Sequence, residues 1–139
     1  INYNQEDVAA RVKKITNGSG VDLILNSVAG DTFARDFEVL APLGQIIWFG
    51  YAAGPPEEIL TELLNNHFTK SVGIRAFVIY TIAQMHPDLM RQSYDVLFRY
   101  LKEGTVKPHI QERIPLAEAS RAHQLLESGA VTGKLILKP

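Results

Sequence analysis

The feature that most constrains this chain is an apolar run that ends abruptly in a turn of small residues. Residues 21–25 are apolar or strand-tolerant and lack alternating polar partners, which indicates a central strand of a parallel sheet, covered on both faces. Residues 26–30 then form a small-residue turn, and Asp31 offers an N-cap for a following helix. Because open α/β sheets bind ligands beyond the carboxyl ends of their strands, this turn is the candidate address of a site.

Two further stretches predict strands of the same sheet. Residues 45–49 are apolar and lead into residues 50–56, a second turn rich in glycine, alanine and proline. Residues 71–80 predict a third strand, in which Arg75 favours an edge position that tolerates a charge. Since the carboxyl ends of parallel strands meet at one rim, we expect the turns at 26–30 and 50–54 to lie together.

Helices with an apolar stripe fill the intervals between these strands. They are expected to begin at Asn4, Asp31, Pro56 or Glu57, and Pro87, and to end near Gly18, near Pro42 and Gly44, and at Gly104 for the last. The inward-facing residues, helix by helix, are Val8, Val12 and Ile15; Phe33, Phe37 and Leu40; Ile59, Leu60, Leu63 and Leu64; and Met90, Tyr94, Leu97 and Leu101. This alternation of strands and helices predicts βαβ units and a doubly wound parallel sheet of the α/β class.

The tail changes character. Residues 106–114 predict a short polar strand with Pro108 inside it, too polar to be central, and residues 132–137 predict a closing strand. Residues 115–129 between them predict a helix with Ala119, Ala122 and Leu126 on one face. We expect these pieces to belong to a neighbouring domain.

Composition excludes several classes of function. Lys and Arg number 14 against 15 Asp and Glu with no basic run, so neither a nucleic-acid nor a membrane partner is indicated. The sequence has no cysteine, and its four histidines are too widely spaced for a metal site, so no zinc is expected within this chain. We expect a soluble, cytoplasmic protein, and the opening residues 1–3, which resemble a strand's end, suggest a fragment.

Several pieces of sequence in a fixed order resemble the second half of a medium-chain dehydrogenase/reductase. They are residues 21–30, 43–50, 104–108, 115–119 with 122–128, and 132–137. The branch they resemble is that of the quinone oxidoreductases and enoyl reductases, which belong to the zinc-binding dehydrogenases. The resemblance implies that residues 1–103 are the second half of a nucleotide-binding Rossmann domain. Residues 104–139 would then be an α+β segment returning to a catalytic domain that is absent here, as is the Gly-rich turn that holds the pyrophosphate.

The resemblance also implies a cofactor, NADP(H), with NAD(H) left open. By match to the family, the residues that line it are Asn26, Ser27 and Val28 on the ribose side, Phe49, Gly50 and Tyr51 on the nicotinamide side, Phe77 and Val78 at the carboxamide, and Gly133 and Lys134 from the tail. Judged singly, the glycines also suit plain turns, and the aromatic and β-branched residues suit a core. No metal ligand or catalytic residue is assigned, because nothing in the sequence positions a base beside Tyr51 or Tyr80.

The function implied is hydride transfer from a nicotinamide cofactor to a quinone or an activated C=C bond in the parent protein. A homodimer through the edge strand at 72–80 is also implied, while the isolated fragment is expected to be inactive. An alternative is a non-catalytic dimerisation or binding module with a vestigial cofactor cleft. A methyltransferase half-sheet is a third reading, and it is disfavoured because those sheets end in an antiparallel hairpin.

Overall fold

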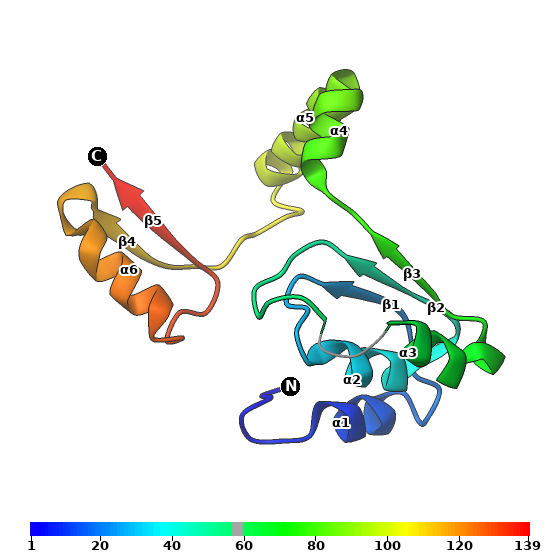
Figure 1. Ribbon diagram of the computed structural model, residues 1–139. Coiled ribbons are helices and arrows are strands. Elements are labelled where there is room, and N and C mark those ends of the chain that lie inside the picture. Colours follow the sequence, from blue (N-terminus) through cyan, green and yellow to red (C-terminus); the bar gives the residue numbers. More distant parts are fainter. Residues whose placement is uncertain (57–59) are drawn as a thin grey trace. The chain divides into compact units, whose positions relative to one another are not determined.

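The computed structural model describes residues 1–56 and 60–139, which divide into two compact units, Ile1–Met85 and His86–Pro139. The division falls before the long helix that begins at Pro87, 18 residues before the expected functional boundary between residues 103 and 104. The assignment of residues 104–139 to a separate functional domain stays a prediction. Both units contain helices and strands (Figure 1).

The first unit contains a parallel sheet in which β1 (Val21–Asn26), β2 (Leu40–Trp48) and β3 (Gly73–Ala76) follow one another in chain order. Leu25 lies opposite Ile47, and Ile47 opposite Arg75, so the register runs straight through the three strands. The parallel direction confirms the α/β prediction. Strand β3 lies at the edge, as the charge of Arg75 indicated.

Helices pack on one face of this sheet, with α1 (Val8–Ile15), α2 (Thr32–Val39) and α3 (Leu60–Asn66) on the same side in Figure 1. The predicted Phe33 and Phe37 of α2 are completely buried, and they form the core with Ala29, Leu40, Ile46 and Leu63. Burying a phenylalanine side chain contributes roughly 1.5–3 kcal/mol, so α2 is the main anchor of this core. A short helical turn η1 (Phe68–Lys70) and helix α4 (Ile79–Met85) complete the unit.

The prediction that residues 21–25 form a central strand covered on both faces is wrong for this unit. Among the described residues β1 pairs only with β2, and it lies at the other edge of the sheet. Leu23 and Leu25 are 56% and 65% exposed, because the helices of the unit cover only the opposite face, where Ile24 lies. The continuous apolar pattern therefore belongs to a strand that is suited to burial on both faces, although in this unit the face of Leu23 and Leu25 is exposed.

The second helix is shorter than predicted. Helix α2 ends at Val39, and Pro42 and Gly44 lie inside β2 rather than at the end of the helix. They still break a regular pattern, because Val21 pairs with Leu40 while Leu23 pairs with Gln45, which leaves the residues between them bulged out of the ladder.

Two other boundaries differ. The cap of α1 is Asp7, whose Oδ1 accepts the Ala10 N–H at 2.7 Å, rather than Asn4, and Ile15 of the expected stripe is exposed. The third strand ends at Ala76, so the predicted residues 77–80 lie in the turn and helix that follow it. Of the two predicted starts of the third helix, Pro56 lies outside any helix. Glu57, and the predicted inward-facing Ile59, lie outside the described residues.

The second unit holds α5 (Pro87–Glu103), β4 (Ile110–Pro115), η2 (Leu116–Glu118), α6 (Ala119–Glu127) and β5 (Lys134–Lys138). Strands β4 and β5 are parallel neighbours joined through α6, and Ile114 and Ala122 are buried between them and the helix. Pro108 precedes the strand instead of interrupting it, and Leu126 is exposed, whereas Leu125 is half-buried. Gly104 ends α5 with a φ of 71°, as predicted.

Candidate functional site

The turns that follow β1 and β2 meet at one rim of the sheet. We name residues 26–30 the first crest and residues 50–54 the second crest. Backbone hydrogen bonds join the two. The Phe49 N–H donates to Asn26 O at 2.8 Å and the Ala53 N–H donates to Val28 O at 2.8 Å. The Ala52 N–H donates to Ser27 O at 3.2 Å and the Gly30 N–H donates to Gly54 O at 3.1 Å. The crests therefore form one continuous surface.

Glycine is needed where the crests approach each other. A Cβ on Gly50 would lie 2.6 Å from Ser27 O and 3.1 Å from Ser27 Cα, both of them backbone atoms that cannot rotate away. A Cβ on Gly30, whose φ is 56°, would lie 2.9 Å from Ala53 O. The absence of a side chain at these two positions thus allows the backbones of the two crests to pack closely.

The first crest is held by a buried polar network. Asn26 and Asp36 are only 5% and 6% exposed. The Asn26 Nδ2 donates to Asp36 Oδ2 at 2.5 Å and to Thr32 Oγ1 at 2.8 Å. The Asn26 Oδ1 accepts the backbone N–H groups of Val28 and Ala29, both at 2.8 Å. The donors and acceptors of the Asn26 side chain are thus all paired within the chain. Ser27 and Val28 are the exposed residues of the predicted ribose side.

Burial raises the pKa of the Asp36 carboxyl above its ordinary value, while the hydrogen bond from Asn26 and the nearby Arg35 guanidinium oppose that change. The Arg35 Nη2 lies 3.8 Å from Asp36 Oδ1. This carboxylate is not among the site residues predicted from the sequence. Its position on α2 between the buried Phe33 and Phe37 was the available signal, because a charge on the buried side of a helix requires a partner.

A first hollow, with a volume of about 220 Å³, brings the predicted ribose-side residues together. Its lining consists of Ile24, Leu25, Asn26, Ser27, Val28, Thr32, Arg35 and Asp36. The hollow is open and half polar, and Arg35 is its one cation among the lining residues. It can accept hydroxyl or anionic groups beside the first crest.

A second hollow, of about 280 Å³, lies beyond the ends of β2 and β3. It is lined by Trp48, Phe49, Gly50, Tyr51, Ala76, Phe77, Val78 and Tyr80. All five residues predicted for the nicotinamide and carboxamide sides therefore surround one apolar space, and both tyrosines considered as proton donors line it. The backbone bond from Phe77 N–H to Trp48 O, at 2.8 Å, ties its two walls together.

Trp48 is a lining residue of the second hollow that was not among the predicted site residues. Its ring makes edge contacts with Phe33 at 5.4 Å and with Tyr51 at 4.9 Å between centroids. Its Nε1 donates to Gly50 O at 2.7 Å. Trp48 thus connects the buried core to the exposed second crest.

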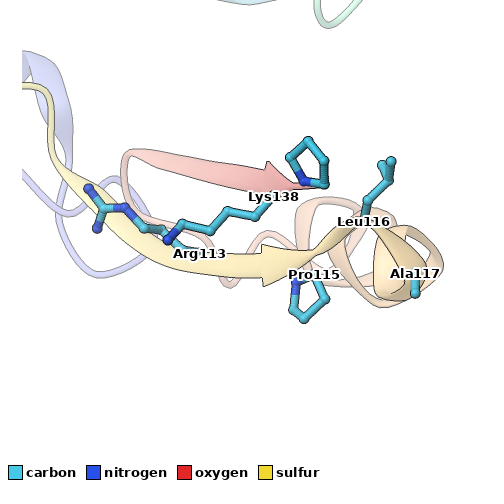
Figure 2. A pocket seen from close by; sticks show the side chains of 6 residues that line it. Arg113, Pro115, Leu116, Ala117 and Lys138 are labelled. Carbon is cyan, nitrogen blue, oxygen red and sulfur yellow. The ribbon is translucent and has the colours of Figure 1, made fainter.

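Gly133 and Lys134 lie in the other compact unit. Gly133 has a φ of 89° and packs directly against the carbonyl of His109, and the Lys134 N–H donates to that carbonyl at 2.9 Å. These contacts begin the pairing of β4 and β5. An open hollow of about 760 Å³ also lies in this unit, and Figure 2 shows its lining residues, Arg113, Pro115, Leu116, Ala117, Lys138 and Pro139. None of the predicted site residues lines it.

The sequence profile of the zinc-binding dehydrogenases matches residues 1–137. The chain belongs to this family. It is 31% identical over 139 residues to the quinone oxidoreductase of Pseudomonas aeruginosa, covering 100% of this chain and 42% of that protein. It is 30% identical over 141 residues to quinone oxidoreductase 1 of Escherichia coli K12, again covering 100% of this chain and 42% of the relative. The chain thus spans less than half the length of these relatives and corresponds to their C-terminal part.

Solved structures of the family share this fold. The quinone oxidoreductase of Pseudomonas syringae pv. tomato superimposes with a TM-score of 0.82 at 30% identity, covering 100% of this chain and 42% of that structure. The Escherichia coli quinone oxidoreductase in complex with NADPH gives a TM-score of 0.80 at 32% identity, with the same coverage. The partial doubly wound sheet predicted from the sequence is confirmed as that of the C-terminal half of these enzymes.

Because the family is described as zinc-binding, the side chains that could bind a zinc ion in this chain are of interest. Within residues 1–56 and 60–139, no group of three or more His, Cys, Asp or Glu side chains is placed to hold an ion. The Nδ1 of His67, the residue after α3, lies 2.9 Å from the carbonyl oxygen of Leu63 in that helix. In these residue ranges the available donor groups do not fit a zinc ion. No helix in this part of the chain is both long and apolar enough to cross a bilayer.

Proposed function

We propose that this chain forms one side of the cofactor cleft of a cytoplasmic NADP(H)-dependent oxidoreductase of the quinone reductase or enoyl reductase type. The single observation that carries the proposal is the second hollow. It gathers Phe49, Gly50 and Tyr51 from the end of β2 with Phe77 and Val78 from the end of β3. Strand ends of a parallel sheet are where this class of fold binds nucleotides.

The proposed division of labour follows the two hollows. The apolar second hollow suits a nicotinamide ring, and Phe77 and Val78 would offer backbone groups to its carboxamide. Beside the first hollow, Ser27 and Val28 would lie against a ribose, while Asn26 shapes the backbone behind them. The bound cofactor supplies the hydride, and the residues of this chain orient it and exclude water.

The relatives support the choice of cofactor and substrate class. An Escherichia coli quinone oxidoreductase of the same fold is complexed with NADPH, and a Burkholderia relative, 29% identical to this chain, is a 2-haloacrylate reductase. Quinones and activated C=C bonds are both hydride acceptors, so we propose this substrate class for the parent enzyme. Tyr51 and Tyr80 line the hollow but are given no catalytic role.

An NADPH titration of the chain, followed by two-dimensional NMR, tests the cofactor wall. We expect a dissociation constant in the millimolar range or weaker, because the family resemblance implies a pyrophosphate-binding turn that is not among the residues of this chain. The shifted signals should be those of Ser27, Val28, Tyr51, Phe77 and Val78. Shifts confined to Arg113 and Lys138 in the second unit would contradict the proposal, and micromolar affinity would contradict the expected weak binding.

A hybrid enzyme tests the activity itself. The matching C-terminal part of the Pseudomonas aeruginosa quinone oxidoreductase is replaced by this chain, and NADPH and NADH oxidation is assayed with a quinone and with an enone. We expect oxidation by the hybrid and none by the isolated chain. A matched hybrid carrying Gly50→Val, which forces the crests apart, should lose most of the activity. A folded hybrid that oxidises neither cofactor would contradict the proposed function.

The free edge of β3 supports a homodimer. Among the described residues β3 pairs only with β2, and Arg75 and Ala76 are exposed at its end. Two such edges can pair across a two-fold axis, so we propose dimerisation through residues 72–80. Because the Phe77 N–H donates to Trp48 O, the N–H of Ala76 points away from β2, to the free edge. Light scattering should show a dimer that Ala76→Pro converts to a monomer, since proline cannot donate to a new ladder. Ala76→Ser is the control, and a wild-type monomer at high concentration would contradict this proposal.

The same edge is what a non-catalytic dimerisation module would use. The two functions separate in the experiments above. A dimer whose hybrid enzyme is folded but inactive favours the module, and an active hybrid favours the reductase.

A further inference from the structure

The first crest takes its shape from a side chain that lies behind it. Asp36 comes from the middle of α2, is almost completely buried, and reaches the crest only through the side chain of Asn26. We propose that Asp36 is a positioning residue that fixes, through Asn26, the backbone on which the cofactor's ribose side would lie. This inference rests on the proposed function for its purpose, but its geometry belongs to this chain alone.

The first step is the orientation of the Asn26 amide. The two ends of an amide are chemically different, and an ionised carboxylate only accepts hydrogen bonds. Asp36 therefore holds Nδ2 toward α2, which leaves Oδ1 facing the N–H groups of Val28 and Ala29. The reverse orientation would place Oδ1 against the carboxylate and Nδ2 against two N–H donors, so the bonds to Asp36, Val28 and Ala29 would be lost.

Thr32 closes the network. Its Oγ1 accepts the second Nδ2 hydrogen of Asn26 at 2.8 Å, and its own hydroxyl donates to Ala29 O at 2.8 Å. Both the N–H and the C=O of Ala29 are thus held by side chains. A network in which every member is satisfied selects one conformation of the turn.

The conformation selected is one that alanine rarely adopts. Ala29 has a φ of 57° and is completely buried, and Gly30 follows with a φ of 56°. A non-glycine residue stays in the left-handed region only where its surroundings over-determine it. The Asn26 side chain supplies that constraint, and the carbonyls of Ser27 and Val28 pass it on to the second crest.

A carboxylate is a costly way to fill this space, because its charge is buried and the Arg35 guanidinium is 3.8 Å away. An apolar side chain would occupy the volume without that cost. Unlike an apolar side chain, the carboxylate fixes the orientation of the Asn26 side-chain amide.

A reciprocal exchange tests the role of Asp36. In Asn26→Asp two carboxylates face each other, and the crest should loosen. In the double variant Asn26→Asp/Asp36→Asn the donor and acceptor are exchanged, and the bond should form again. We expect amide exchange at Val28 and Ala29 to become about tenfold faster in Asn26→Asp and to return to within about twofold of wild type in the double variant. Glu38→Gln, an exposed carboxylate of the same helix, is the control and should change neither amide.

Unchanged exchange in Asn26→Asp, or a double variant no better than the single one, would overturn the proposal. If Asn26→Asp fails to fold, a measurement on the wild-type protein tests the proposal instead. The side-chain amide protons of Asn26 should exchange far more slowly than those of the exposed Asn65, and equal rates would overturn the proposal. Because no nucleotide is present, these outcomes are independent of the cofactor. A lack of NADPH-induced shifts at Ser27 and Val28 would overturn the proposed cofactor wall instead.

Discussion

The two crests stand side by side at one rim but are stabilised in different ways. The first crest is held by hydrogen bonds from Asn26, behind which lies the buried Asp36. The second crest carries no charged residue and depends on the Trp48 ring and on backbone bonds to the first. A βα turn can therefore be stabilised by a polar network of its own. It can also be stabilised by contacts with a neighbouring turn that has such a network.

The two crests are also bonded to each other. The N–H groups of Ala52 and Ala53 donate to carbonyls of the first crest, and the Gly30 N–H donates to Gly54 O of the second, so the polar network of the first crest is connected to the second. The exposed aromatic rings of Phe49 and Tyr51 then extend from that support. Changes beneath both crests should cost most, and changes within either crest should cost less.

The largest expected effect comes from removing the ring beneath both crests. Phe33→Ala deletes a completely buried side chain that packs against Trp48, and we expect a loss of about 3–5 kcal/mol in the free energy of unfolding. Urea denaturation followed by Trp48 fluorescence measures it. Phe68→Ala, at a position that is 80% exposed, is the matched control and should change stability by less than about 0.5 kcal/mol. Equal losses in the two variants would mean that the rim does not rest on Phe33.

The next effect tests the contact between the crests. Gly50→Ala places a Cβ 2.6 Å from the Ser27 carbonyl, so the backbone must shift, and we expect a loss of about 1–3 kcal/mol. Gly73→Ala in β3 is the control, because its nearest neighbour would be the flexible Gln45 side chain at an ordinary 3.8 Å. Denaturation midpoints measure both variants. A Gly50→Ala protein as stable as Gly73→Ala would show that the crests separate freely.

Much of this fold was predictable from sequence because its strands and helices have different apolar periods. The buried ring pair Phe33 and Phe37, the parallel strands and the edge position of Arg75 all follow from spacing and charge. The exposure of Leu23 and Leu25 could not be predicted in this way. A run of apolar residues indicates that a strand is suited to burial on both faces, but it does not indicate which helices or strands of the same unit cover those faces.

The site divides in the same way. The two hollows gather eight of the residues named from the family resemblance, because strand ends in a parallel sheet are close whatever the side chains are. Asp36 was missed because its partner Asn26 is ten residues away and the pairing depends on how α2 folds back over β1. Gly133 and Lys134 lie in the other unit, and their part in cofactor binding stays a prediction.

A smaller effect isolates one bond of the second crest. Trp48→Phe keeps an aromatic ring against Phe33 but removes the Nε1 donor to Gly50 O, and we expect a loss of about 0.5–1.5 kcal/mol. Thermal unfolding followed by circular dichroism measures it, since the variant has no tryptophan. Amide exchange at Val28 and Ala29 should stay within about twofold of wild type, because their N–H groups donate to Asn26 Oδ1 and not to the second crest. Much faster exchange there would show that the second crest also stabilises the first.

The smallest effect is on pH dependence, and it belongs to the first crest alone. Burial raises the pKa of Asp36 above 3.8, so the folded state takes up a proton at a higher pH than the unfolded state does. Asp36 therefore favours folding most when it is protonated in both states, below pH 3.8, and that contribution is lost as the pH rises through the raised folded-state pKa. The free energy of unfolding of wild type relative to Asp36→Asn should accordingly fall between about pH 3 and pH 7. Urea titrations of both proteins across this range measure the difference, and a rise with pH would show that the bond from Asn26 and the charge of Arg35 outweigh burial.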